Sequence, residues 1–218
     1  MSFESQLAGF FFYFIIVTNI MSNVFGYKTL GKEEATFKLN QINSNKNNFK
    51  ISFVLIMLEH LGIIFLVIML FLAYNSFNIL LAIIWILSRS GEAISQIYHK
   101  ILSYWKLLGI AEDYESSNED DKSSLIKKSE KILSSKNSNF VVAQILFSIG
   151  TFSYSLLFVI YDILPIWIGY FGIIASILYG IDNFISYRNQ FQTSIWDIAG
   201  IFILIFEIIL GGWLLFDL

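Results

Sequence analysis

Residues 51–98 read ISFVLIMLEHLGIIFLVIMLFLAYNSFNILLAIIWILSRSGEAISQIY, and this stretch decides the fold. It contains two apolar runs, 51–73 and 77–98, separated only by Tyr74-Asn75-Ser76. Each run can cross the hydrocarbon core of a bilayer as a helix, which takes about 20 residues. A spanning helix satisfies its backbone hydrogen bonds internally, so the two runs predict a tight transmembrane hairpin.

The same apolar pattern continues along the rest of the chain. Further spans are expected at about 7–25, 140–160, 166–186 and 196–216. Hydrophobic residues make up 56% of the 218 positions and charged residues only 14%, against roughly a quarter in soluble domains. A soluble protein of this composition would expose large apolar patches. We therefore predict an all-α fold, a polytopic six-transmembrane-helix bundle that forms a single integral membrane domain over residues 1–218.

Lysine and arginine lie on one side of this predicted bundle. Of the 14 basic residues, all but Arg89 fall in the loops that follow the first, third and fifth spans. Positively charged loops are retained in the cytoplasm. We therefore expect a multi-pass cell membrane protein with cytoplasmic basic loops and extracytoplasmic termini. The basic residues of the three loops are Lys28, Lys32, Lys38, Lys46, Lys50, Lys100, Lys106, Lys122, Lys127, Lys128, Lys131, Lys136 and Arg188.

The loop between the third and fourth spans, residues 99–138, is the longest of the three. Residues 101–110 (ILSYWKLLGI) form an amphipathic cytoplasmic segment that could lie along the inner membrane surface. The acidic stretch 112–121 is expected to be a solvated linker. Residues 123–137 are expected to form a helix that leads into the fourth span. A protein partner would dock on this loop.

Ionisable residues inside a membrane span are costly, so each is a candidate functional residue. With a rise of about 1.5 Å per residue, those of this chain fall in the cytoplasmic half of the membrane or near its centre. Their shared depth predicts a polar cavity that is open to the cytoplasm. Arg89 and Glu92, three residues apart, share a helix face and can pair. The candidate ligand-binding residues are Arg89, Glu92, Glu59, Glu207, His60 and Asp182.

This set places one arginine among four acids, Glu59, Glu92, Asp182 and Glu207. If all four acids were ionised and buried, the excess negative charge could not be sustained. Some must be protonated, hydrated or balanced by a bound cation. The leading interpretation is therefore a protein that binds or moves a small ligand or ion. Arg89 would take a negative group of the ligand, and Glu59 or Glu92 an amine.

Two other classes of function fit the same residues. A structural or regulatory membrane subunit would bind a protein or lipid partner, and its buried charges would neutralise one another. An intramembrane enzyme acting on a lipid or isoprenoid would need a reactive group, and the sequence identifies no catalytic residue. His60 and His99 are the two histidines, too few for a typical zinc site, so no metal or cofactor is predicted.

Composition also bears on nucleic-acid binding, on cysteine chemistry and on the presence of a signal peptide. The net charge of −3 and the lack of a basic groove give no reason to expect a nucleic-acid partner. With no cysteine, disulfides and thiolate metal sites are excluded. The first six residues lack the basic region of a signal peptide, so the first apolar run is expected to stay in the protein.

Three groups of residues form a pattern along the chain. They are Arg89-Ser90-Gly91-Glu92-Ala93, then Pro165, Gly169, Gly172 and Tyr179, and finally Glu207 with Trp213-Leu214-Leu215. This pattern resembles that of a prokaryotic membrane family known as domain of unknown function 4386. The resemblance runs from the first span to the sixth, and it implies that Arg89, Glu92 and Glu207 belong to the polar pattern of the family. It implies no activity. Many members have a histidine near the start of the fourth span, where this chain has Ala143-Gln144.

Overall fold

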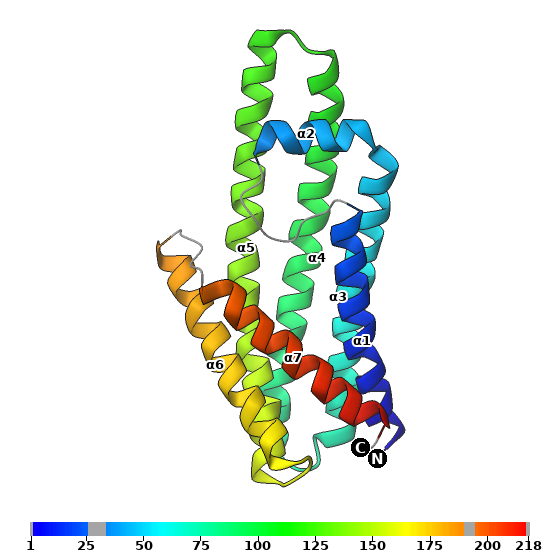
Figure 1. Cartoon of the computed structure of the whole chain (residues 1–218), viewed down its shortest axis with the longest axis vertical. Helices are drawn as coiled ribbons and strands as arrows, with labels where there is room; N and C mark the ends of the chain where they lie inside the picture. The colour runs from blue at the N-terminus through cyan, green and yellow to red at the C-terminus, as the bar shows by residue number, and fades with distance from the viewer. Residues whose placement is uncertain (1, 26–33, 190–194, 217–218) are drawn as a thin grey trace.

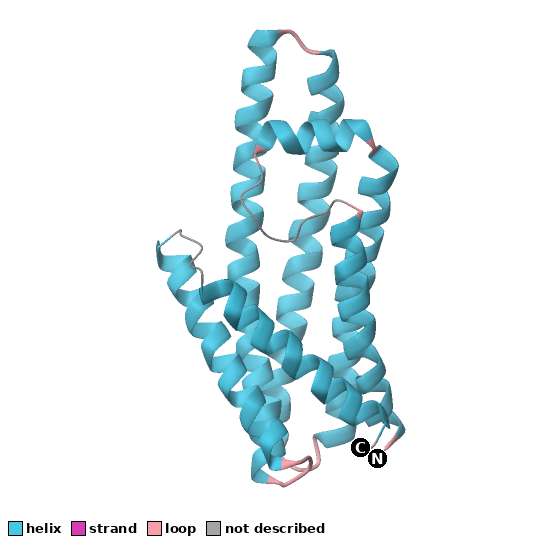
Figure 2. Ribbon diagram, in the orientation of Figure 1, coloured by secondary structure: helices cyan, strands magenta, loops and turns pink. Residues whose placement is uncertain are grey.

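The computed structural model describes residues 2–25, 34–189 and 195–216. In these ranges the chain forms seven helices and no strand (Figure 2). Six of the helices are long and apolar enough to cross a membrane, and each overlaps one of the six predicted apolar stretches. The predicted all-α membrane bundle is therefore confirmed, and the protein is a multi-pass membrane protein that lies in a lipid bilayer.

The helices follow one another with short connections, as Figure 1 shows. All except α2 are the candidate membrane spans. Both termini lie at one end of the bundle, which we call the terminal end (Figure 1). The opposite end carries α2 and the tip of the α4–α5 hairpin, and we call it the basic end. The helices are α1 (Phe3–Val24), α2 (Ala35–Ser44), α3 (Lys46–Tyr74), α4 (Ile79–Ser116), α5 (Glu119–Ile160), α6 (Ile166–Asn189) and α7 (Ile195–Phe216).

The tight turn between α3 and α4 is built by two asparagines. Asn75 follows α3, and its side-chain nitrogen donates to the carbonyl of Phe71 at 2.6 Å. The side-chain oxygen of Asn78 accepts from the backbone N–H groups of Leu80 and Leu81, which are unpaired donors at the start of α4. These caps let two spans reverse direction in a few residues without leaving backbone groups unpaired.

The loop after the third span differs from its prediction. Helix α4 continues without a break to Ser116, and only Ser117 and Asn118 separate it from α5. At 1.5 Å per residue α4 is roughly 57 Å long, well beyond a hydrocarbon core of about 30 Å. The expectation of a helix lying along the membrane surface at 101–110 is therefore wrong. Residues 112–121 are mostly exposed, as expected of a solvated linker, but they are helical except at Ser117 and Asn118. The helix expected over 123–137 is confirmed as part of α5.

A second hydrophobic core at the basic end explains why α4 continues. Leu39 of α2 and Phe49 of α3 pack against Leu107 of α4 and its neighbours, and Leu133 of α5 completes the cluster. The ring of Tyr104 stacks on that of Phe49, with centroids 5.0 Å apart. The apolar face of 101–110 thus buries against helices rather than lipid. The sequence analysis missed α2 because most of its ten residues are polar, although Ala35, Leu39 and Ile42 recur at helical spacing.

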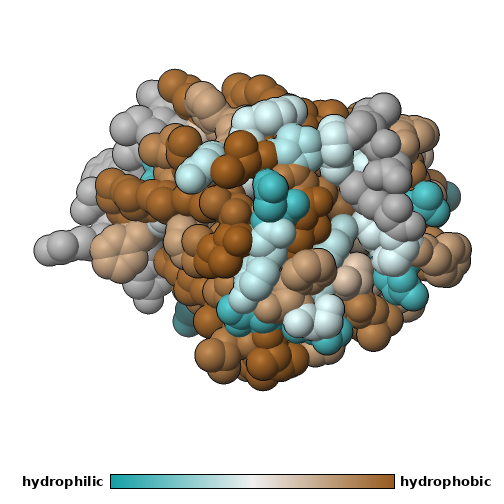
Figure 3. Space-filling view, turned by 90° about the horizontal axis from the view of Figure 1, so that it is seen from below, coloured by the Kyte–Doolittle hydropathy of each residue, from teal (hydrophilic) through white to brown (hydrophobic). Residues whose placement is uncertain are grey.

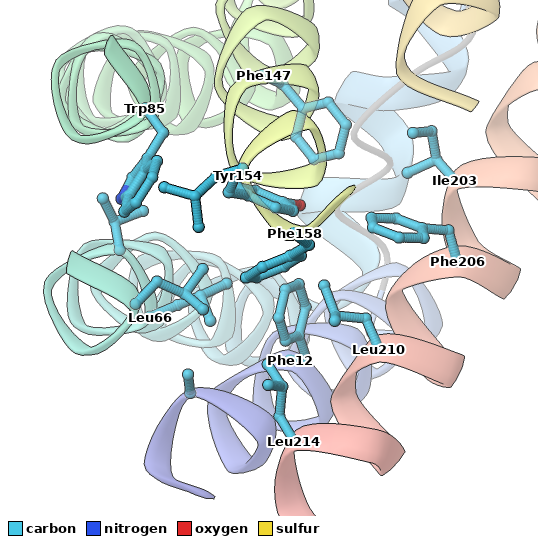
Figure 4. Close-up of a cluster of buried hydrophobic side chains, with 14 of the residues drawn as sticks. Phe12, Leu66, Trp85, Phe147, Tyr154, Phe158, Ile203, Phe206, Leu210 and Leu214 are labelled. Atoms are coloured by element: carbon cyan, nitrogen blue, oxygen red, sulfur yellow. The ribbon is translucent and has the colours of Figure 1, made fainter. Parts of the chain in front are cut away.

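The main core lies in the terminal-end half of the bundle and joins helices from both ends of the chain. Figure 4 shows Phe12 of α1, Trp85 of α4 and Leu210 of α7 converging on the rings of Tyr154 and Phe158 of α5. The ring of Tyr154 stacks on that of Phe206, with centroids 6.3 Å apart. This packing closes the terminal-end half of the bundle to solvent.

The surface of the terminal end is dominated by hydrophobic residues. Figure 3 looks onto this end and shows a narrow band of hydrophilic residues between larger hydrophobic areas. No lysine or arginine occurs in the segments on which this end is built, the start of α1 and the α3–α4 and α5–α6 connections. The two ends of the bundle therefore differ strongly in positive charge.

Helices α1 and α7 cross at the terminal end through glycines. A Cβ atom on Gly9 would lie 2.6 Å from the backbone nitrogen of Leu215, and one on Gly211 would lie 2.9 Å from Cβ of Phe12. The hydroxyl of Tyr13 donates to the carbonyl of Ile208 at 2.9 Å. Small residues let two membrane helices approach until their backbones touch, which is how such crossings gain dispersion energy.

This crossing gives a test of the fold. We expect Gly9→Ala to lower the free energy of unfolding by about 1–3 kcal/mol, because the added methyl group must push two backbones apart. Gly109→Ala is the matched control, since a Cβ there meets no atom within 4 Å and alanine is the better helix former. Thermal unfolding of the protein in lipid nanodiscs measures both. Equal effects of the two variants would contradict the close α1–α7 contact.

Candidate functional site

A polar cavity of about 320 Å³ lies between the two cores and is bounded by all six membrane helices. Its size is at the lower end of the range for ligand sites, roughly 300–1,000 Å³. Apolar residues such as Ile63, Phe147 and Ile203 line the rest of its wall. The polar side chains that line it are Asn19, Glu59, His60, Arg89, Glu92, Lys100, Gln144, Tyr179 and Glu207.

Most of the residues predicted from the sequence meet in this cavity. Arg89 and Glu92 of α4 line it together with Glu207 of α7. Glu59 and His60 of α3 form another part of its wall. Asp182 of α6 is buried but does not line the cavity. A ligand-binding role for these residues remains a prediction, and the structure adds that Asp182 stands apart from the others.

Arg89 and Glu92 form an ion pair within one turn of α4. Nη1 of Arg89 donates to Oε2 of Glu92 at 2.8 Å, and the two residues are 2% and 4% exposed. The guanidinium group lies over the ring of Phe147, 4.2 Å from its centroid. A Cβ atom on Gly150 would lie 2.5 Å from Cγ of Arg89, so the glycine makes room for the arginine stem. Helix α5 thus holds the guanidinium in one position.

The second cation of the cavity is Lys100, which is 2% exposed. Its Nζ lies 3.2 Å from Nε2 of His60, and Nδ1 of His60 lies 2.7 Å from the carbonyl oxygen of Ile56. A carbonyl only accepts, so Nδ1 must carry the proton and Nε2 must accept from the lysine ammonium. This arrangement fixes a neutral His60 in one tautomer and holds a charged Lys100 beside it.

Sequence reasoning missed Lys100 because it lies two residues beyond the predicted end of the third span at residue 98. It was counted among the solvated loop lysines. A signal was nevertheless present, since Arg89, Glu92, Gln96 and Lys100 are spaced three or four residues apart. That spacing places them on one helix face, provided that the helix continues past the membrane boundary. Only the packing of α4 against α2 shows that it does.

Two carboxylates of the cavity keep free acceptor capacity. Oε1 of Glu59 accepts from the side chain of Asn19 at 3.0 Å, which ties α3 to α1. The other oxygen, Oε2, is buried and has no hydrogen-bond partner among the described residues. Glu207 is half-buried and makes no hydrogen bond or ion pair with any residue that the structure describes. An unpaired buried acceptor is costly, so Oε2 of Glu59 favours a bound donor.

The charges of the cavity are nearly balanced. Three carboxylates face two cations, so one carboxylate is in excess when all groups are ionised. Lys100 attracts Glu59 and Glu92, and Arg89 attracts Glu207. The sequence-based picture of one arginine among four acids is thus corrected on both counts, because Lys100 joins the cluster and Asp182 does not.

The wall formed by α5 and α6 is neutral. The hydroxyl of Tyr179 donates to Oε1 of Gln144 at 3.1 Å. Gln144 is therefore a lining residue of the cavity, at the position where the chain departs from the pattern it resembles. Among the described residues, no group of three or more histidine, aspartate or glutamate side chains is placed to hold a metal ion.

Comparison with curated proteins and with solved structures finds no match. The family model described as Domain of unknown function (DUF4386) matches residues 7–217, nearly the whole chain. The match includes every residue that lines the cavity and agrees with the family expected from the sequence. The protein is therefore a member of the DUF4386 family of multi-pass membrane proteins.

Proposed function

We propose that this protein binds a small ligand or ion in the polar cavity, or moves it through the membrane domain formed by residues 1–218. The observation that carries the proposal is the oxygen Oε2 of Glu59, buried against a cavity of about 320 Å³ with no donor among the described residues. An unpaired buried acceptor destabilises the folded protein, and a ligand that donates a hydrogen bond to it removes that cost.

The pattern of pairing supports binding over a purely structural role. A structural cluster would pair its charges and leave no space, as Arg89 and Glu92 do. Glu59 instead faces the cavity with a buried oxygen that has no donor among the described residues, and the half-buried Glu207 lines the same cavity. The space beside them exceeds the roughly 10–15 Å³ that one water needs by more than an order of magnitude.

The same residues indicate the chemistry of the ligand. The excess carboxylate and the free acceptors favour a group that is positively charged and donates hydrogen bonds, such as an ammonium group. Arg89 and Lys100 each have donors beyond those that Glu92 and His60 use, so a negative group could bind on the opposite side. The cavity is therefore suited to a cation or to a zwitterion with an amine.

We also propose that the basic end faces the cytoplasm and that both termini lie outside the cell. The support is the placement of the lysines, which lie on α2, at the start of α3 and along the α4–α5 hairpin (Figure 1). Positive residues near membrane helices are retained on the cytoplasmic side. The ligand would then reach the cavity from the cytoplasmic half of the membrane.

A second candidate function is a regulatory subunit that binds a protein through the basic end. The observation that favours it is the projection of α2 and the α4–α5 hairpin beyond the ends of α1, α6 and α7 (Figure 1). Removing residues 111–136 would not test this function cleanly, because Ala111 and Leu133 belong to the core at the basic end. Substitution of exposed tip residues such as Glu119 and Asp120 leaves that core intact.

Orientation can be measured directly because the chain has no cysteine. Asn118→Cys places a thiol at the tip of the α4–α5 hairpin, and Ser76→Cys places one in the α3–α4 turn at the terminal end. In intact cells we expect a membrane-impermeant maleimide to label Ser76→Cys only. Asn118→Cys should react after permeabilisation. The opposite pattern would contradict the proposed orientation.

Binding can be measured with methylammonium, the simplest cation that carries the proposed group. We expect saturable binding of labelled methylammonium to the protein in phosphatidylcholine nanodiscs. Glu59→Gln should weaken this binding at least about 10-fold, because hydrogen bonds to charged groups contribute roughly 1.5–3 kcal/mol. The amide also places a donor where the ligand needs an acceptor.

Asp182→Asn is the matched control for that measurement. It neutralises a carboxylate that is buried in the same bundle but does not line the cavity. We expect its affinity for methylammonium to equal that of the wild type. If Asp182→Asn and Glu59→Gln weakened binding equally, or if methylammonium did not bind, the proposed function would be wrong.

A further inference from the structure

Among the residues that the structure describes, the cavity reaches the surface of the bundle between α1 and α7. The lining residues contributed by α3, α4, α5 and α6 are all buried, whereas those that are not buried belong to α1 and α7. Ile20 of α1 is 56% exposed and Leu204 of α7 is 40% exposed. The lining residues that are not buried form what we call the α1–α7 mouth: Ile15, Ile16, Asn19, Ile20, Gly200, Leu204 and Glu207.

The helix crossing explains why the mouth is open. Helices α1 and α7 touch through Gly9 and Gly211 at the terminal end, and α7 then runs diagonally away from α1 toward α6 (Figure 1). At Gly200, in the opposite half of α7, a Cβ atom would meet no atom within 4 Å. The close contact at one end and the space at the other are two results of the same crossing angle.

The mouth opens toward lipid. The side chains beside it on α1 and α7, including Val17, Ile201 and Ile205, are exposed and apolar within membrane-spanning helices. An alkyl chain can lie across these side chains without losing contact with the bilayer. Asn19 and Glu207 lie at the mouth beside the apolar side chains, and the charged residues of α3 and α4 are buried deeper in the cavity. The site is therefore amphipathic at its entrance and charged inside.

We propose that the ligand is a bilayer amphiphile whose head group carries a primary ammonium, and that it enters sideways through the α1–α7 mouth. This inference rests on the proposed function and names the ligand and its route. The ammonium would donate to Oε2 of Glu59 and to Glu207, and a phosphate would lie near Lys100 and Arg89. A quaternary ammonium has no N–H and cannot satisfy Glu59.

The charges of the site match a zwitterionic head group better than an anionic one. Two carboxylates with free acceptors would oppose a head group that is only negative. The cavity volume of about 320 Å³ holds a head group and not the chains, which agrees with chains that stay outside the mouth. Phosphatidylethanolamine is therefore the probe that tests the proposal, and phosphatidylcholine is the matched lipid without a donor.

The experiment measures competition with labelled methylammonium in nanodiscs of fixed acyl chains. Replacing half of the phosphatidylcholine by phosphatidylethanolamine should raise the apparent Kd of methylammonium at least about 10-fold. Gly200→Phe narrows the mouth at a position where a Cβ atom meets no other atom. It should still admit the small methylammonium ion but hinder the larger lipid, so it should reduce that competition at least about 10-fold. Gly109→Phe, equally free of contacts but on α4 outside the cavity, should leave the competition as in the wild type.

Three results would overturn the lateral route. The first is methylammonium binding that phosphatidylethanolamine does not weaken, and this result leaves the proposed function standing. The second is free phosphoethanolamine in solution competing as well as the lipid does. The third is equal competition in the wild type and in Gly200→Phe. Failure of methylammonium to bind at all would instead contradict both the proposed function and this inference.

Discussion

The ion pair between Arg89 and Glu92 is the constraint on which the rest of the bundle depends. A guanidinium group inside a bilayer is stable only when it is paired and shielded from lipid. Glu92 accepts a hydrogen bond from the guanidinium at 2.8 Å. On α5, the ring of Phe147 packs against the guanidinium and Gly150 leaves room for the stem of Arg89. Because the pair is fixed within α4 and α5 packs onto it, the orientation of both helices about their axes is determined.

The cavity exists because two hydrophobic cores, one toward each end of the bundle, are separated by a layer that contains charged and polar side chains. Toward the terminal end, aromatic rings such as Phe158 and Phe206 fill the space between helices. Toward the basic end, α2 closes a second core around Leu107. Between these cores the residues are polar and their side chains do not fill the space. The balance of two cations and three carboxylates lets this layer persist without a dense network of hydrogen bonds.

The polar layer connects the fold to the proposed ligand. Each paired group, such as His60 with Lys100, is fixed in one protonation state by its partner, so these residues position the site. Glu59 and Glu207 lack such partners among the described residues, and they are the groups left to act on a ligand. The open side between α1 and α7 follows from the tilt of α7, and the cavity that contains these acids opens on that side.

The sequence by itself determined the six spans and five of the cavity's charged or histidine residues, Arg89, Glu92, Glu59, His60 and Glu207. The physical reason is that the bilayer demands long apolar helices and makes each charge within them conspicuous. Only the tertiary structure decided that Lys100 joins the site and Asp182 does not. Burial of a residue near a membrane boundary depends on which helices pack there. The local sequence shows that α2 and the continuation of α4 are amphipathic, but it does not show that their apolar faces pack against each other. The mouth likewise depends on a crossing angle, which arises from contacts between residues far apart in the chain.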